Sequence, residues 1–215
     1  MATTTNNLSY ENLSGLGKLN NNDLVFNNLN GTIGGSVLSG NASLRNLIPH
    51  LINPLQKVWV DATIDTKQLN LLKLIQLIKT GEQENTTVSN DTVSLPQQFQ
   101  VNLRTTINEL NYGNFKAKII TGQLSLKNQH LYTKNIKFKT SGGNVLFNSE
   151  IEQTSNHHFL WTGNSRLDGI DIQQFFTSVD NFGQDFLTDK NIKGKGSLIL
   201  DFGMLFSPNL TLIEP

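Results

Sequence analysis

The chain has 215 residues, carries 17 Lys and Arg against 17 Asp and Glu, and contains no cysteine. Zero net charge disfavours nucleic-acid binding, which needs a basic excess to neutralise phosphates. The lack of cysteine excludes disulfides, thiolate metal sites and cysteine nucleophiles. Charged residues make up only 16% of the chain, while 28 Asn and 13 Gln supply neutral amides for the surface. No run approaches the roughly 18 apolar residues that a membrane span needs.

The first half of the chain, residues 1–94, is expected to form one β-rich unit. Asn30-Gly31 is typical of a two-residue hairpin turn, because both residue types tolerate positive φ. Gly34-Gly35 suits a bulge or a turn between strands. Residues 80–94 have few apolar side chains and predict an exposed linker.

A helix is predicted over about residues 67–79, because apolar side chains surround most of a helical wheel there. Asp65 or Thr66 is the expected cap. A helix this apolar must be covered on most sides. It would therefore act as a lid on the sheet or as a plug in a core, and its candidate contact residues are Leu71, Leu72, Ile75 and Ile78.

The second half, residues 95–190, alternates apolar and polar residues with a period of two, which is typical of strands with one apolar and one solvated face. A second helix is predicted at about 171–179, with Asp171 as its cap and Phe175 and Phe176 as lid candidates. Residues 191–215 would open a further unit. The candidates for an apolar groove are Phe115, Ala117, Ile119, Ile136, Phe138, Leu198, Leu200 and Phe202.

The two halves share landmarks in the same order, which indicates an internal duplication. The shared features are an opening Leu-x-Tyr, leucines spaced by five, a glycine pair, a tryptophan (Trp59 and Trp161) and an apolar-Asp pair before each helix. The predicted fold is therefore mainly β, with tandem repeats of a curved antiparallel sheet, an open groove and one short helix in each repeat.

The sequence contains no complete motif that is typical of a catalytic or cofactor site. The acidic residues show no spacing typical of glycosidases or metal sites, and the four histidines do not form a ligand set. Gly15-Leu16-Gly17-Lys18 lacks the remaining residues of a phosphate loop. The sequence therefore predicts a protein that is not an enzyme and has no metal site and no cofactor.

The second half resembles the C-terminal region of the AsmA-like family, in the form found in envelope proteins of the Bacteroidetes type. The resemblance covers roughly residues 95–202, and residues 8–72 more loosely through the duplication. Its most specific stretch is Ile170-Asp171-Ile172-Gln173-Gln174-Phe175-Phe176. The other stretches that carry it are Leu110-Asn111-Tyr112, Gly122 to Leu126 and on through Leu131 to Ile136, Gly142-Gly143, Asn181 to Phe186 and Asn191 to Gly196.

This resemblance implies a β-groove segment of a long periplasmic protein that is anchored in the inner membrane. The resemblance implies that this anchor belongs to a part of the full-length protein outside this chain. It also implies a part in phospholipid transport to the outer membrane and in outer-membrane biogenesis. The partners would be phospholipid acyl chains and envelope proteins at either end, with no nucleic acid and with membrane contact only through other parts of the full-length protein.

Two alternatives remain open at the level of sequence. The same alternation describes a β-sandwich in which the groove candidates are ordinary core residues that pack on one another. The alternative function is that of a structural or adhesin-like β-repeat protein, which acts by protein–protein contact through its polar face.

Overall fold

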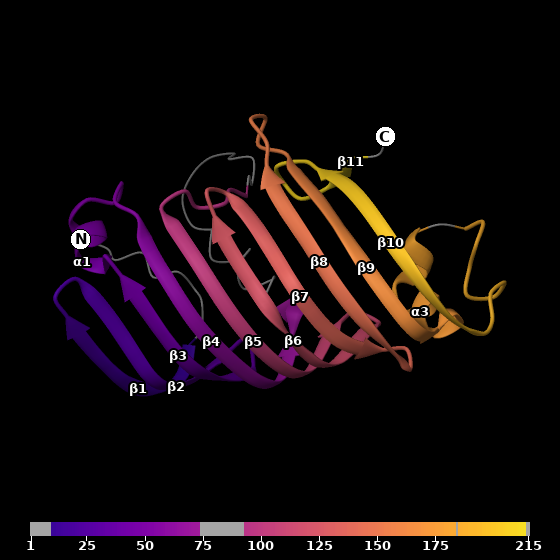
Figure 1. Cartoon of the computed structure of the whole chain (residues 1–215), viewed down its shortest axis with the longest axis horizontal. Coiled ribbons are helices and arrows are strands. Elements are labelled where there is room, and N and C mark those ends of the chain that lie inside the picture. Colours follow the sequence, from indigo (N-terminus) through magenta and orange to yellow (C-terminus); the bar gives the residue numbers. More distant parts are fainter. Residues whose placement is uncertain (1–9, 74–92, 184, 214–215) are drawn as a thin grey trace.

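The computed structural model describes residues 10–73, 93–183 and 185–213, and these residues form one open sheet with few helices. The sheet has 11 strands, and each strand lies beside the next one in the chain, in the order β1 to β11 (Figure 1). No second sheet faces it within the described ranges, so the sandwich alternative is not what these residues form. The prediction of a mainly β chain is confirmed.

Four strands and one helix make up the described part of the first half. The strands are β1 (Tyr10–Asn20), β2 (Asp23–Ile33), β3 (Ser36–Arg45) and β4 (Val58–Asn70). Helix α1 (Leu47–Ile52), which the sequence pattern did not predict, connects β3 to β4. The Leu47 amide donates to the carbonyl of Asn22 at 2.9 Å, so the start of this helix is held at the β1–β2 turn.

The second half continues the same sheet. Its strands are β5 (Phe99–Tyr112), β6 (Phe115–Lys127), β7 (His130–Thr140), β8 (Gly143–Gln153), β9 (Phe159–Asp171), β10 (Lys195–Phe206) and β11 (Leu212–Ile213). Helix α3 (Ile172–Ser178) and the 3-10 helix η1 (Asp180–Gly183) lie between β9 and β10. Strands β4 and β5 pair in parallel, whereas all other neighbours are antiparallel, so the prediction of an antiparallel sheet is wrong at this one junction.

Two hairpin turns fall at or beside glycine pairs, and a turn is one of the two roles expected of Gly34-Gly35. Gly34 and Gly35 form the β2–β3 turn with φ of 58° and 76°, and Ser141 and Gly142 form the β7–β8 turn with φ of 46° and 75°. Two consecutive positive φ values are typical of the type I′ turns that match strand twist. The prediction of a turn at Asn30-Gly31 is wrong, because both residues lie inside β2 and pair with β3.

The same bulge occurs in β2 and in β7. Asn28 and Asn135 both have positive φ, and each interrupts the pairing of its strand with the next one. The Asn28 amide donates to Oδ1 of Asn41 at 3.0 Å, and the Asn135 amide donates to Oδ1 of Asn148 at 2.8 Å. Each bond joins residues 13 positions apart, so an asparagine on the next strand satisfies a backbone donor that the bulge removes from the ladder.

The helix predictions are right in part. Helix α3 lies within the predicted 171–179, and the Asp171 side chain caps it by accepting from the Gln174 amide at 3.0 Å. The first helix was predicted to begin near residue 67, but β4 continues to Asn70 and helical structure starts at Leu71. Leu69, taken as part of that helix, lies on the sheet and packs on its core. Ile75, Ile78 and most of the predicted linker lie outside the described residues.

Ile119 is placed differently from the prediction, which grouped it with Phe115 and Ala117. A bulge in β6 gives Ile119 a φ of 53°, and opposite β7 the strand advances three residues from Lys118 to Thr121 while β7 advances only two, from Lys139 to Lys137. The extra residue reverses the alternation, because a shift of one residue turns every later side chain to the other face. Ile120 therefore joins Ala117 in the core, while Ile119 is 58% exposed on the opposite face.

Ile119→Asn is expected to raise stability by about 1 kcal/mol, because a β-branched side chain is strained at positive φ whereas Asn tolerates it. Thermal unfolding would measure the change. Ile199→Asn is the matched control, since Ile199 is also exposed, at 71%, but is not among the residues with positive φ. A lower melting temperature for Ile119→Asn than for the unsubstituted chain would contradict the strain argument.

Candidate functional site on the apolar face of the sheet

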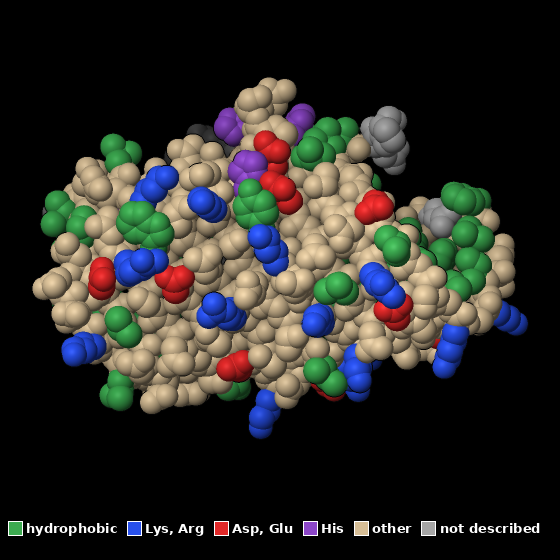
Figure 2. All heavy atoms as spheres, in the orientation of Figure 1, with side chains coloured by type: hydrophobic (Ala, Val, Ile, Leu, Met, Phe, Trp, Pro, Cys, Tyr) green, Lys and Arg blue, Asp and Glu red, His purple; other side chains and the backbone are tan. Residues whose placement is uncertain are grey.

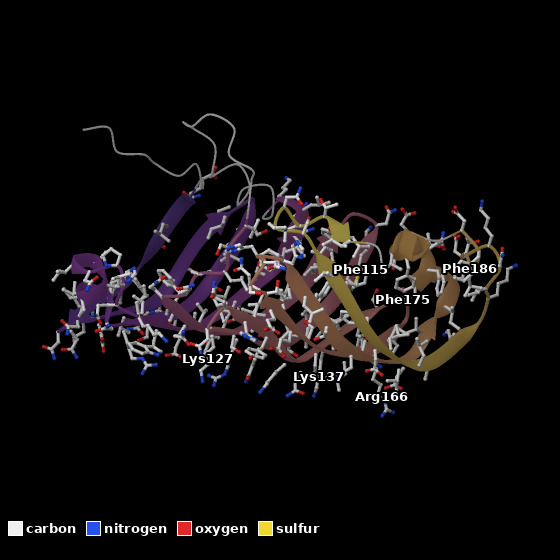
Figure 3. All side chains as sticks on the ribbon, turned by 90° about the horizontal axis from the view of Figure 1, so that it is seen from above. Phe115, Lys127, Lys137, Arg166, Phe175 and Phe186 are labelled. Atoms are coloured by element: carbon white, nitrogen blue, oxygen red, sulfur yellow. The ribbon has the colours of Figure 1, made fainter. Side chains whose placement is uncertain are left out.

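The sheet has two chemically distinct faces. We call the side that bears Phe115 and Ala117 the apolar face, and the side that bears Lys137 and Arg166 the polar face. Figure 3 shows Lys127, Lys137 and Arg166 pointing to one side of the sheet and Phe115 and Phe175 lying on the other. The strands bend toward the side of Phe115 and Phe175.

The separation of charge between the faces is complete for the paired residues. Register and alternation place every Lys, Arg, Asp and Glu that has a cross-strand partner in β1–β10 on the polar face. Figure 2, which looks onto the polar face, shows these charged side chains spread across the sheet. The apolar face therefore runs across ten strands without one paired charge.

One core cluster lies on the apolar face at the centre of the sheet. Ile107, Ala117 and Ile120 are buried there by their neighbours on the same face. The predicted groove residues Phe115, Ile136 and Phe138 pack against this cluster, with Leu69 and Leu110. The Phe115 and Phe138 rings meet edge to face, with centroids 6.1 Å apart.

A second cluster on the same face joins β8, β9 and β10. Val145, Leu167 and Ile170 form it, and the predicted groove residues Leu198 and Leu200 pack against it with Phe138 and Phe147. Phe175 of α3 also packs on this cluster, so this helix covers one end of the face. Phe176, the other predicted lid residue on α3, contacts the ring of Phe182 at 5.3 Å between centroids and is not part of the cluster.

Aromatic rings gather beside the second cluster around Phe202, the last predicted groove residue. Phe202 stacks on Phe147 with ring centroids 6.0 Å apart and meets Trp161 edge to face at 5.2 Å. Its ring lies over Gly163, where an added Cβ would approach ring atoms to 2.7 Å. The sequence pattern missed Trp161 and Leu167, because Gly163 and Ser165 interrupt the apolar alternation of β9. It missed Phe147 because three consecutive apolar residues, Val145 to Phe147, hide the alternation of β8.

The apolar face is only partly covered by protein. Most of its side chains are half-buried, because a single layer shields them only through neighbours on the same face. Leu13 and Leu19 of β1 are 71% and 58% exposed. Exposed apolar surface that is continuous in this way favours the binding of another molecule.

Two buried side-chain donors on this face lack an acceptor among the described residues: Nε1 of Trp161 and Nε2 of Gln153. Gln153 lies opposite Phe159, and Trp161 lies opposite Ile151, so the two side chains are diagonal neighbours on β8 and β9. The carboxamide oxygen of Gln153 is already used, since it accepts from the Leu95 amide at 2.9 Å. Buried donors are ordinarily paired, so this end of the face favours a ligand or water that carries an acceptor.

Trp59 and Trp161, which were matched as landmarks of the two halves, lie on different faces of the sheet. Trp59 lies opposite Arg45 on the polar face and is 39% exposed, whereas Trp161 lies opposite Ile151 on the apolar face. The two tryptophans therefore do not occupy equivalent structural positions, although they lie at similar points in the sequences of the two halves.

The polar face of the described strands carries surface groups that hydrogen-bond to one another. Asp61 accepts from Arg45 at 2.9 Å and from Asn102 at 3.0 Å, beside a shallow hollow of about 470 Å³. His130 lies 2.7 Å from Glu150. Loss of hydration and the nearby carboxylates of Glu150 and Glu152 raise the pKa of the Tyr132 phenol. Of these two carboxylates, Glu150 raises the pKa of the phenol more, because it acts both through its charge and through a hydrogen bond.

Within residues 10–73, 93–183 and 185–213, no three His, Cys, Asp or Glu side chains are grouped so that they could hold a metal ion. No helix of that part of the chain is both long enough and apolar enough to cross a membrane.

Comparison with known proteins returns no relative. No protein-family model matches the chain, and no curated protein or solved structure is significantly similar to it. The chemistry of the two faces is therefore what bears on the function of this chain.

Proposed function

We propose that the chain is a non-enzymatic lipid-conduit segment that holds acyl chains along its apolar face. The observation that carries the proposal is the lack of any paired charge on this face across ten strands, together with its partial exposure. Hydrocarbon is the ligand that such a surface suits, since each buried methylene contributes about 0.8 kcal/mol without any specific polar contact.

The proposal includes tandem curved units that form an open groove. The repeated bulges at Asn28 and Asn135, each bonded to an asparagine of the next strand, support two related units. The bend of the strands toward the apolar side supports a trough (Figure 3). The continuous ladder between β4 and β5 would let hydrocarbon pass from one unit to the next without crossing a gap.

The two unpaired donors suggest how a lipid would be oriented. Nε1 of Trp161 and Nε2 of Gln153 could donate to an ester carbonyl while the acyl chains lie along the sheet. With the resemblance to AsmA-like proteins, these features favour a segment of an envelope protein that carries phospholipid between the inner and outer membranes.

Native mass spectrometry of the chain purified from bacteria tests the proposal. We expect adducts of phospholipid mass that survive gel filtration and are lost on organic extraction. A chain that carries no lipid, and that fails to take up added phospholipid from detergent, would overturn the conduit. Such a result would leave a β-repeat protein that acts through protein contacts.

A further inference from the structure

The polar face carries a group of lysines that the conduit does not use. Lys116, Lys118, Lys137 and Lys139 lie on the adjacent strands β6 and β7, and Lys118 stands directly opposite Lys139 in the ladder. Like charges that face each other across a ladder are destabilising. Glu109 is the nearest acidic partner, with Oε1 3.6 Å from Nζ of Lys118, and it offsets one of the four charges.

A hollow of about 410 Å³ opens among these lysines. Three of them line it, and the rest of its wall comes from the β7–β8 turn and its flanks. No carboxylate lines the hollow, while two hydroxyl side chains and one amide side chain do. The complete lining is Lys116, Lys118, Lys139, Thr140, Ser141, Gly142, Gly143 and Asn144. Its chemistry therefore suits an anion with several oxygen acceptors.

Ile119 stands among the same lysines. The bulge holds it at a φ of 53° and leaves it 58% exposed, beside a second hollow of about 350 Å³ that Lys137 and Lys139 also line. Asp168 lines this second hollow too, but its carboxylate is paired with Arg166 at 3.2 Å. Backbone strain that exposes an apolar side chain is costly, so its persistence points to a contact made by that side chain. The two hollows share Lys139, so the apolar and cationic features form one surface.

We propose that this lysine patch, together with Ile119, docks on the surface of an anionic phospholipid bilayer. Lipid phosphates would accept hydrogen bonds from the lysines of the hollow, and the Ile119 side chain would enter the region just below the headgroups. The chain as a whole has no net charge, so the attraction comes from the local excess of lysine. The patch lies on the face opposite the acyl-chain surface, so both could be occupied at once.

Vesicle co-sedimentation tests the docking with two bilayers, one of phosphatidylcholine alone and one that contains about a third phosphatidylglycerol. We expect binding to the anionic vesicles that weakens at high salt, and little binding to the neutral ones. Lys118→Gln with Lys139→Gln should reduce partitioning into the anionic vesicles by roughly 25-fold, because each lysine near such a surface contributes about fivefold. Ile119→Asn should reduce it by roughly a further fivefold.

The matched control is Lys18→Gln with Lys127→Gln, which removes the same charge from the same face outside the patch. It should leave partitioning within about twofold of the unsubstituted chain. Circular dichroism would check the fold of each variant, and the Lys118 and Lys139 variant should remain folded because it removes a repulsion.

Equal losses in the patch and control variants would overturn the proposal, and so would equal binding to neutral and anionic vesicles. Saturation of the patch by soluble inorganic pyrophosphate with no vesicle binding would also overturn it in favour of a free anion. The lipid adducts of the conduit should be unchanged in the Lys118 and Lys139 variant, so failure of the docking and failure of the conduit can be distinguished.

Discussion

Leu124→Lys is expected to reduce the lipid that co-purifies with the chain by roughly tenfold or more, while the sheet remains folded. Leu124 is half-buried on the apolar face, opposite Leu103 and Thr133, and outside both core clusters. A lysine that faces hydrocarbon costs about 2.5–3.5 kcal/mol at full depth, and even half of this accounts for a tenfold loss. Native mass spectrometry of the purified variant would measure the lipid adducts.

Thr106→Lys is the matched control for this prediction. Thr106 is exposed on the polar face and lies opposite Asp65, so a lysine there adds the same charge without facing the acyl chains. Its lipid adducts should match those of the unsubstituted chain. Equal lipid content in the two lysine variants would show that the lipid is held elsewhere.

Leu167→Ala is expected to lower the free energy of unfolding by about 3 kcal/mol, because it leaves a cavity where there is now close packing. Leu167 is 1% exposed and lies between Val145 and Leu198, so one side chain holds three strands together. Chemical denaturation would measure the loss.

Ile199→Ala provides the comparison on the neighbouring strand. Ile199 is paired with Arg166 on the polar face and is 71% exposed, so its truncation should change stability by no more than about 0.5 kcal/mol. Similar losses for Leu167→Ala and Ile199→Ala would contradict the placement of the core on the apolar face.

Seven of the eight groove candidates lie on the apolar face, because a period of two predicts the face of a side chain correctly wherever the strand is regular. Phe115, Ala117, Ile136 and Phe138 needed no more than a period of two. The predicted face of Ile119 was wrong because a bulge adds one residue to β6. The alternating residues on which that prediction rested include no glycine or asparagine that would indicate positive φ. Asn135 and Gly169 mark comparable irregularities with residue types that do tolerate that conformation.

Whether a predicted lid residue packs on the sheet depends on tertiary contacts, which a helical pattern in the sequence does not specify. Phe175 and Phe176 are adjacent on α3, yet only Phe175 packs on the sheet core, while Phe176 meets Phe182 beyond the helix. At the other predicted helix, the strand β4 extended through Asn70 because Leu69 and Asn70 pair with β5. Strand pairing over a long ladder outweighed local helix propensity there.

The sequence by itself determined the strand-rich class, the segregation of apolar from charged residues and the cap of α3, because these follow from local periodicity and from a single side chain bonding its own helix. Only the tertiary structure decided that β4 and β5 run parallel, where each bulge falls and which face Ile119 and Trp59 occupy. Those features depend on register between strands, and register is set by hydrogen bonds between residues that are distant in the chain.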